Sequence, residues 1–330
     1  MARKSSFLIL AILTLFLFSC SSIDDQLENT KINYRREMRN FVQIISEYGR
    51  SHRDNFIIIP QNGQELLTLD GIYDGPLALE YINAIDGVGR EDLFYGYSGD
   101  NRSTPEDAFQ FMLPYLILSE KNGIEVLVID YCSAESRMTR SYVENEKKGF
   151  ISFAADHRGL DNIPEYPEEP WNVNNRDIKS LSDAANFLYL INPEEYSTVE
   201  QMISSINTTN YDLLIIDLFD NMGNILSSDQ IERLKTKADG GKRLVIAYMS
   251  IGEAEDYRFY WKNDWEKNPP LWMDRENPHW KGNYKVRYWE PSWQELILGK
   301  EDAYLDKILK TGFDGVYLDI IDAFDYFEFK

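Results

Sequence analysis

Short apolar segments that end in a carboxylic acid recur along the chain and constrain its fold more than any other feature. Residues 127–130 (Leu-Val-Ile-Asp), 214–217 (Leu-Ile-Ile-Asp) and 316–319 (Val-Tyr-Leu-Asp) share this pattern, and residues 245–252 lead into Glu253. Apolar runs of this length are typical of buried parallel strands. Because parallel strands align their carboxyl ends, we expect these acids to meet at one rim. The pattern predicts an α/β fold of the TIM (β/α)8 barrel class, with the active site at its C-terminal face.

The remaining segments alternate between strand and helix patterns in a way that supports one barrel domain. Nine segments have strand character: residues 55–59, 87–89, 126–130, 150–155, 187–191, 213–217, 244–250, 284–288 and 315–319. Helices are predicted at residues 32–50, 104–122, 198–208, 227–238 and 294–311. An eight-stranded barrel has one strand fewer than this, and residues 87–89 or 150–155 are the candidates for the extra segment. Residues 159–175, rich in Pro and Asn, are expected to form a connector or lid.

The N-terminus has the pattern of an export signal. Residues 1–4 are basic, residues 7–18 are apolar but short for a membrane span, and Leu17-Phe18-Ser19-Cys20 follows. This is similar to a bacterial lipoprotein signal, with lipidation at Cys20; an uncleaved anchor is the alternative. The sequence thus predicts a signal peptide (residues 1–20), a tether (21–33) and one barrel domain (34–330). It also predicts a lipid-anchored location in the bacterial cell envelope, on the periplasmic face or the cell surface, with membrane contact only through the anchor.

The charge of the chain narrows the classes of partner. The formal net charge is −21 and the sequence pI is about 4.6. Nucleic acid and anionic membrane surfaces would be repelled, so a neutral or cationic substrate is favoured. Acidity that serves only solubility is an equal alternative.

The types of reactive residue favour glycoside hydrolysis. The three histidines lack the spacing of a metal-ligand pair, and neither a Gly-x-Ser-x-Gly motif nor a P-loop is present. Carboxylates and aromatic residues remain, and glycosidases use an acid pair beside rings that stack on sugars. No metal or cofactor is expected. The candidate sugar-binding side chains are the amides Gln61 and Asn62, the charged groups Asp130, Glu253 and Arg258, and Trp289 within a tryptophan cluster (Trp272, Trp280, Trp289, Trp293).

Several longer motifs resemble one known family. Residues 247–258 (Ala-Tyr-Met-Ser-Ile-Gly-Glu-Ala-Glu-Asp-Tyr-Arg), 286–293 (Val-Arg-Tyr-Trp-Glu-Pro-Ser-Trp) and 312–322 resemble glycoside hydrolase family 114 and its relatives called extracellular endo-α-1,4-polygalactosaminidases. Residues 58–63 and 91–95 are also similar. The resemblance implies a TIM barrel that hydrolyses α-1,4-linked galactosamine polymers. The motifs occur in a different order from the family pattern, which indicates a circular permutation.

The resemblance also implies roles for individual residues. Asp319 matches the strand-end catalytic acid of the family and is expected to act as nucleophile or base. Glu91 matches the second carboxylate over a shorter motif and is expected to be the general acid, with Glu253 as the replacement candidate. Sugar-binding roles carry over to Asp217, Glu253, Gln61, Asn62, Tyr248 and Arg258.

The sequence therefore predicts a monomeric, cofactor-free endo-glycosidase that cleaves an amino-sugar polysaccharide. Two alternatives stay open. A non-catalytic carbohydrate-binding TIM barrel on the cell surface would use the same aromatic and amide groups without turnover. A metal-assisted hydrolase would use clustered aspartates to bind Mg²⁺ or Ca²⁺, and its activity would be lost in EDTA.

Overall fold

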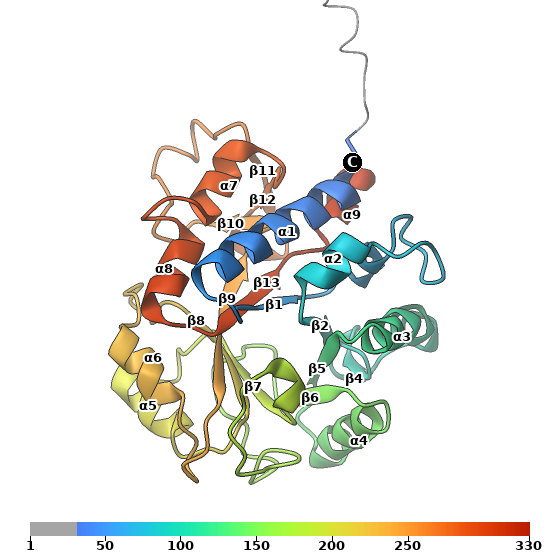
Figure 1. Ribbon diagram of the computed structural model, residues 1–330, viewed down its shortest axis with the longest axis vertical. Helices are drawn as coiled ribbons and strands as arrows, with labels where there is room; N and C mark the ends of the chain where they lie inside the picture. The colour runs from blue at the N-terminus through green and yellow to red at the C-terminus, as the bar shows by residue number, and fades with distance from the viewer. Residues whose placement is uncertain (1–31) are drawn as a thin grey trace, which may run out of the picture. The chain divides into compact units, whose positions relative to one another are not determined.

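The computed structural model describes residues 32–330, of which Tyr34–Lys330 form one compact unit (Figure 1). The predicted signal peptide, the lipidation site Cys20 and nearly all of the predicted tether lie outside the described residues. Among residues 32–330, no helix combines the length and apolar character that a membrane crossing requires.

Eight parallel strands form the centre of the fold. They are β1 (Ile57–Pro60), β2 (Gly87–Glu91), β5 (Glu125–Tyr131), β6 (Ile151–Ala155), β7 (Phe187–Leu190), β8 (Leu213–Asp217), β9 (Leu244–Ser250) and β13 (Gly315–Asp319). Five pair in the order β1-β13-β9-β8-β7, and the other three pair in the order β2-β5-β6. The first and last of the eight are therefore neighbours, with Ile57 opposite Gly315.

The two parallel sheets meet at two junctions of different character. At one, Gln61 and Gly89 form a parallel bridge, and the Asn62 amide donates to the Gly89 carbonyl at 2.8 Å. At the other, the rings of Phe153 on β6 and Phe187 on β7 lie 5.8 Å apart. No strand pairing joins β6 to β7 in the described part of the chain. The predicted α/β class with a parallel sheet is confirmed, but a closed eight-stranded barrel is not.

Helices surround these strands. The α-helices are α1 (Tyr34–His52), α2 (Leu79–Ala84), α3 (Glu106–Lys121), α4 (Glu135–Glu146), α5 (Val199–Ile206), α6 (Ser228–Leu234), α7 (Pro291–Ile297), α8 (Tyr304–Thr311) and α9 (Ala323–Glu328). Two short 3₁₀ helices are η2 (Gln64–Leu67) and η3 (Leu181–Asp183). Helix α1 illustrates the principle of assembly, because Phe41, Val42 and Ile45 recur at helical spacing and are fully buried. In Figure 1 it lies between α2 and α8, both of which it contacts.

The ninth predicted strand is the one that lies outside the parallel sheets. Residues 284–288 overlap β12 (Trp280–Val286), which pairs antiparallel with β10 (Glu253–Glu255) and β11 (Met273–Asn277). Both segments suspected of being extra, residues 87–89 and 150–155, belong to parallel strands. Periodicity alone did not reveal this, since a short run of apolar and aromatic residues suits either kind of sheet.

Two helix predictions also differ from the structure. The single helix predicted at residues 294–311 is divided into α7 and α8, because Leu298 is extended and Gly299 has a φ of +87°. Helix α4 was not predicted, since its charged sequence has little apolar periodicity; it buries Met138 and Tyr142. A small antiparallel hairpin, β3 (Tyr95–Gly96) and β4 (Gly99–Ser103), follows β2.

Candidate active site

A cleft of about 830 Å³ opens beyond the carboxyl ends of the parallel strands. Ligand sites of α/β folds characteristically lie at this edge. Eight of the predicted site residues line the cleft: Gln61, Asn62, Glu91, Asp217, Tyr248, Glu253, Arg258 and Asp319. The structure thus brings together side chains from both ends of the chain.

Glu91 lies at the end of β2 and is held by two donors. The Tyr131 hydroxyl donates a short hydrogen bond to Glu91 Oε1, and Asn62 Nδ2 donates to Oε2 at 3.2 Å. The Arg158 guanidinium lies 3.9 Å from the centre of the Tyr131 ring, and it is fixed by Asp92 at 2.8 Å. A chain of contacts therefore orients the Glu91 carboxylate in the cleft.

Asp319 lies at the end of β13 and also accepts two hydrogen bonds. The Tyr248 hydroxyl donates to Oδ2 at 2.5 Å, and the Ile320 amide donates to Oδ1 at 2.7 Å. Burial, together with the negative charge of Glu91, raises the pKa of Asp319 to about 8. Asp319 therefore holds a proton at neutral pH.

The backbone after Asp319 is strained. Ile320 has a φ of +60°, which is rare for a β-branched residue and tends to occur at functional sites. Its carbonyl approaches Gly252 so closely that a Cβ there would lie 2.1 Å from the oxygen. Gly252 is thus required for the turn that places Asp319 at the rim.

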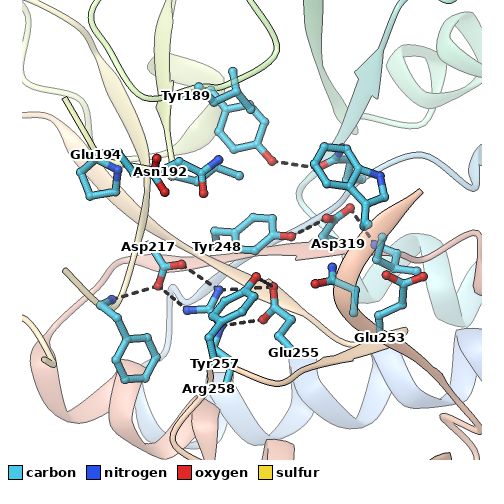
Figure 2. A pocket seen from close by; sticks show the side chains of 18 of the residues that line it. Tyr189, Asn192, Glu194, Asp217, Tyr248, Glu253, Glu255, Tyr257, Arg258 and Asp319 are labelled. Atoms are coloured by element: carbon cyan, nitrogen blue, oxygen red, sulfur yellow. Dashed lines mark hydrogen bonds and ion pairs between the residues drawn. The ribbon is translucent and has the colours of Figure 1, made fainter. Parts of the chain in front are cut away.

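A second cluster of charges is an internal ion-pair network (Figure 2). Arg258 donates to Asp217 from Nη1 at 2.9 Å and to Glu255 from Nε at 2.5 Å. The Tyr257 hydroxyl donates to the other oxygen of Glu255 at 2.6 Å. The side chains of Arg258 and Glu255 are almost fully buried. Asp217 and Arg258 line the cleft as predicted, but much of their bonding capacity is used between themselves.

Glu253 forms hydrogen bonds within the antiparallel sheet. Its Oε1 accepts hydrogen bonds from Lys285 Nζ at 2.9 Å and from Asn277 Nδ2 at 2.8 Å. Both partners belong to the antiparallel sheet, β10-β12-β11. Although Glu253 lines the cleft, it is fully buried, and its carboxylate links the three strands of this sheet, since Glu253 itself belongs to β10. It is therefore a poor replacement for Glu91.

Two predicted sugar-binding residues lie elsewhere. Asp130 is buried away from the cleft and accepts from the amides of Phe94 and Tyr95 and from the Ser141 hydroxyl. Side chains alternate along a strand, so the residue of β5 that reaches the cleft is the next one, Tyr131. Asp130 is a structural residue, and its prediction as a ligand-binding group needs this correction.

Trp289 needs a similar correction. It packs against Tyr34 and Phe327, with ring centres 5.0 and 4.8 Å apart, and does not line the cleft. Trp272 and Trp293 are buried in the core. Of the predicted tryptophan cluster, only Trp280 reaches the cleft.

The sequence interpretation missed several cleft residues. Tyr131 and Tyr189 come from strand ends, Arg158 from a loop, and Asp322 follows the strained turn. The Tyr189 hydroxyl donates to Gln61 at 3.0 Å and so holds this amide in the rim. A tyrosine near the end of three parallel strands (Tyr131, Tyr189, Tyr248) was a signal that could have identified these positions.

A metal-binding cluster is not found among residues 32–330, where no three His, Cys, Asp or Glu side chains are arranged to hold an ion. The lone free cysteine of this region, Cys132, is buried, and burial raises the pKa of its thiol to about 12. This keeps the thiol protonated and unreactive.

The pKa of Asp319 has a consequence for stability. Because its value of about 8 exceeds the ordinary 3.8, the folded protein retains a proton that the unfolded chain releases. This stabilisation is complete at low pH and is lost as pH rises towards 8. We expect D319N, which has no such proton to lose, to melt several degrees above the wild type at about pH 8. The advantage should shrink towards pH 4; melting curves across this range that stay parallel would contradict the assignment.

Comparison with known proteins connects this geometry to a family. Residues 174–329 match the model of glycoside-hydrolase family GH114. The chain is also 42% identical over 180 residues to an uncharacterized protein of Methanocaldococcus jannaschii, covering 54% of this chain and 49% of that protein. Uncharacterized proteins of Thermotoga maritima and Deinococcus radiodurans are 40% and 39% identical over 121 and 122 residues, 37% of this chain in each case. These matches span 36% and 37% of the two relatives.

Proposed function

Because residues 174–329 belong to glycoside-hydrolase family GH114, we propose that this chain is an endo-acting glycoside hydrolase. The proposed substrate is an amino-sugar polysaccharide similar to α-1,4-galactosaminan, as the motif resemblance implies. The observation that carries the proposal is the position of Glu91 and Asp319 in one cleft, where the charge of one raises the pKa of the other. Hydrolysis of a glycosidic bond needs such a pair, with one member protonated and one ionised.

The roles within the pair follow from the position of the proton. Asp319 donates it to the leaving oxygen, and Glu91 acts on the anomeric carbon directly or through a water molecule. This assignment exchanges the roles expected from the sequence. Tyr131 and Asn62 orient the Glu91 carboxyl group by donating to its two oxygens. We expect kcat/KM to fall above about pH 8, where Asp319 loses its proton.

The charge of the cleft supports an amino-sugar substrate. Eight carboxyl groups line it, of which Asp319 is protonated at neutral pH and Asp217, Glu253 and Glu255 are paired with Arg258 or Lys285. The other four are Glu91, Glu194, Asp220 and Asp322. Two of the lining cations are already paired, Arg258 with Asp217 and Arg158 with Asp92. A cleft with excess negative charge attracts a polymer that carries positively charged ammonium groups.

The permuted order of motifs fits the arrangement of the strands. We propose that the eight parallel strands act as one barrel, and that in related chains the termini lie between the counterparts of β6 and β7, whereas the counterpart of β13 continues into that of β1. Strands β13 and β1 are paired neighbours here, as a permutation requires. The family match covers residues 174–329, the second half of this chain. This agrees with a permutation in which the first half of this chain corresponds to a later part of the family pattern. We further propose a monomer tethered to the cell envelope by lipid on Cys20.

The direct test is hydrolysis by the protein from Ser21 onward. The polymers should include α-1,4-galactosaminan, its fully N-acetylated form and the β-linked polymer chitosan, with products separated by mass. Oligomers from the first polymer alone are expected, and their release should continue in EDTA. Binding without any product from the tested polymers would favour the non-catalytic carbohydrate-binding alternative instead.

A further inference from the structure

The outer edge of the cleft carries two exposed aromatic side chains. Tyr257 is 62% exposed and Trp280 is 58% exposed, and both line the cleft. Large aromatic rings are costly to leave in water, and the nearby tryptophans Trp265 and Trp272 are buried. Within the protein, the Tyr257 ring contacts the Arg258 guanidinium, which lies 5.1 Å from the ring centre, whereas Trp280 is left more than half exposed.

The two rings belong to adjacent segments. Strand β10 pairs with β12, so that Glu255 lies opposite Asn283. The register continues beyond the strand, where the Asp256 amide donates to the Gly282 carbonyl at 2.8 Å. Tyr257 follows Asp256 directly, and Trp280 precedes Gly282 by two positions. We call Tyr257 and Trp280 together the aromatic lip.

The base of the aromatic lip is rigid. The fully buried Glu253 carboxylate binds Lys285 and Asn277, one from each strand of the β11–β12 hairpin. Tyr284 packs on Trp261 with ring centres 4.9 Å apart. Because the supporting contacts are internal, Trp280 is presented to the cleft from an ordered hairpin, which lowers the entropy lost on binding.

The aromatic lip is separate from the groups that act on the bond. Trp280 begins strand β12 of the antiparallel sheet and Tyr257 follows β10, whereas Glu91 and Asp319 end parallel strands. The Tyr257 hydroxyl is bonded to Glu255 and not to either member of the pair. Arg258 lies over one face of the Tyr257 ring, and the exposed part of this ring, together with the Trp280 ring, is left for stacking.

We propose that the aromatic lip is a distal sugar-binding subsite, where Trp280 and Tyr257 stack on a ring of the polymer away from the bond that is broken. Sugar rings have an apolar face that suits aromatic stacking, and an ammonium substituent would gain from the electron-rich face of Trp280. The subsite makes the protein prefer long chains to short ones. The role of this subsite in turnover rests on the proposed hydrolase function, whereas the binding of polymer to the subsite does not.

Binding to D319N measures the subsite without turnover. Against this parent, D319N/W280A should bind α-1,4-galactosaminan roughly tenfold more weakly, equivalent to the loss of one good aromatic contact. The same change should weaken binding of the disaccharide less than the polymer. D319N/W280F should recover most of the affinity, because it restores a ring. D319N/F111A is the matched control, since Phe111 is 55% exposed but lies on α3, outside the cleft.

The outcomes separate the two proposals. Equal polymer affinity for D319N and D319N/W280A, with matching melting temperatures, would overturn the subsite. So would equal losses for polymer and disaccharide, or the same loss in D319N/F111A. If the wild type hydrolyses none of the polymers but still needs Trp280 to bind one, the hydrolase proposal fails and the subsite stands.

Discussion

Replacing Asp319 with asparagine should reduce hydrolysis by about 10²–10⁴-fold and leave polymer binding intact, because the variant lacks the proton that the leaving oxygen needs. E91Q should lose activity at least as severely, since it removes the charge that acts at the anomeric carbon. Initial rates on α-1,4-galactosaminan, with affinities from calorimetry, provide the measurement.

The control for these variants is another acid in the same cleft. Asp220 lines the cleft, but its carboxylate accepts hydrogen bonds from the amides of Met222 and Asn224 in its own loop. D220N should therefore keep activity within tenfold of the wild type. If D220N lost as much activity as D319N, turnover would depend on the overall negative charge of the cleft and not on one specific pair of carboxyl groups.

Azide rescue tests which carboxyl group has which role in a retaining enzyme. With E91A and a substrate that has a good leaving group, azide would replace the missing nucleophile and give a glycosyl azide of inverted configuration. With D319A, azide would attack the glycosyl-enzyme and give retained configuration. The opposite pattern would return Asp319 to the role of nucleophile and Glu91 to that of acid.

The second large effect is expected at Arg258. Its side chain is 5% exposed and joins Asp217 to Glu255, whose side chains are 10% and 2% exposed. R258M leaves two buried carboxylates without their cation, which should lower the free energy of unfolding by about 3–5 kcal/mol. Denaturant unfolding at pH 7 measures this loss. Activity should fall as well, because the same network forms one wall of the cleft.

The pH dependence of the R258M defect follows from Asp217. Burial raises the pKa of Asp217, and the opposing effect of Arg258 lowers it. Without the arginine this pKa rises further, so protonation relieves the defect and the stability difference should narrow as pH falls. R233M is the matched control, since it breaks an exposed pair with Glu200 and should leave stability nearly unchanged. An equal loss in both variants would contradict a special role for the buried network.

The sequence predicted the strands and their terminal acids well because both depend on local patterns. The positions of β8, β9 and β13 were predicted from apolar runs bounded by Gly or Asp. The acids Asp217 and Asp319 lie at the cleft as expected. Asp130 has the same local sequence pattern, but its side chain lies on the other face of the strand, away from the cleft. A shift of one residue along a strand moves a side chain to the other face, and a short apolar run does not fix that register.

The partners of the site residues depend on contacts between distant segments, which a single sequence does not specify. Arg158 reaches Tyr131 and Asp92 from a loop, and nothing in its local sequence indicates this. Glu253 and Arg258 were correctly placed at the cleft, but their ion pairs depend on how the antiparallel sheet folds back. The tryptophan cluster was overestimated as a binding surface for the same reason, since Trp272 and Trp293 fill the core and Trp289 packs against it.

The pairing of β1 with β13 also bears on the order of events during biosynthesis. Strand β13 lies between β1 and β9, so the five-stranded sheet stays incomplete until residues 315–319 have left the ribosome. Contacts between such distant segments are closed late and slowly. A nascent chain of this design therefore remains unassembled, with one member of its acid pair still missing, until residue 319 has left the ribosome.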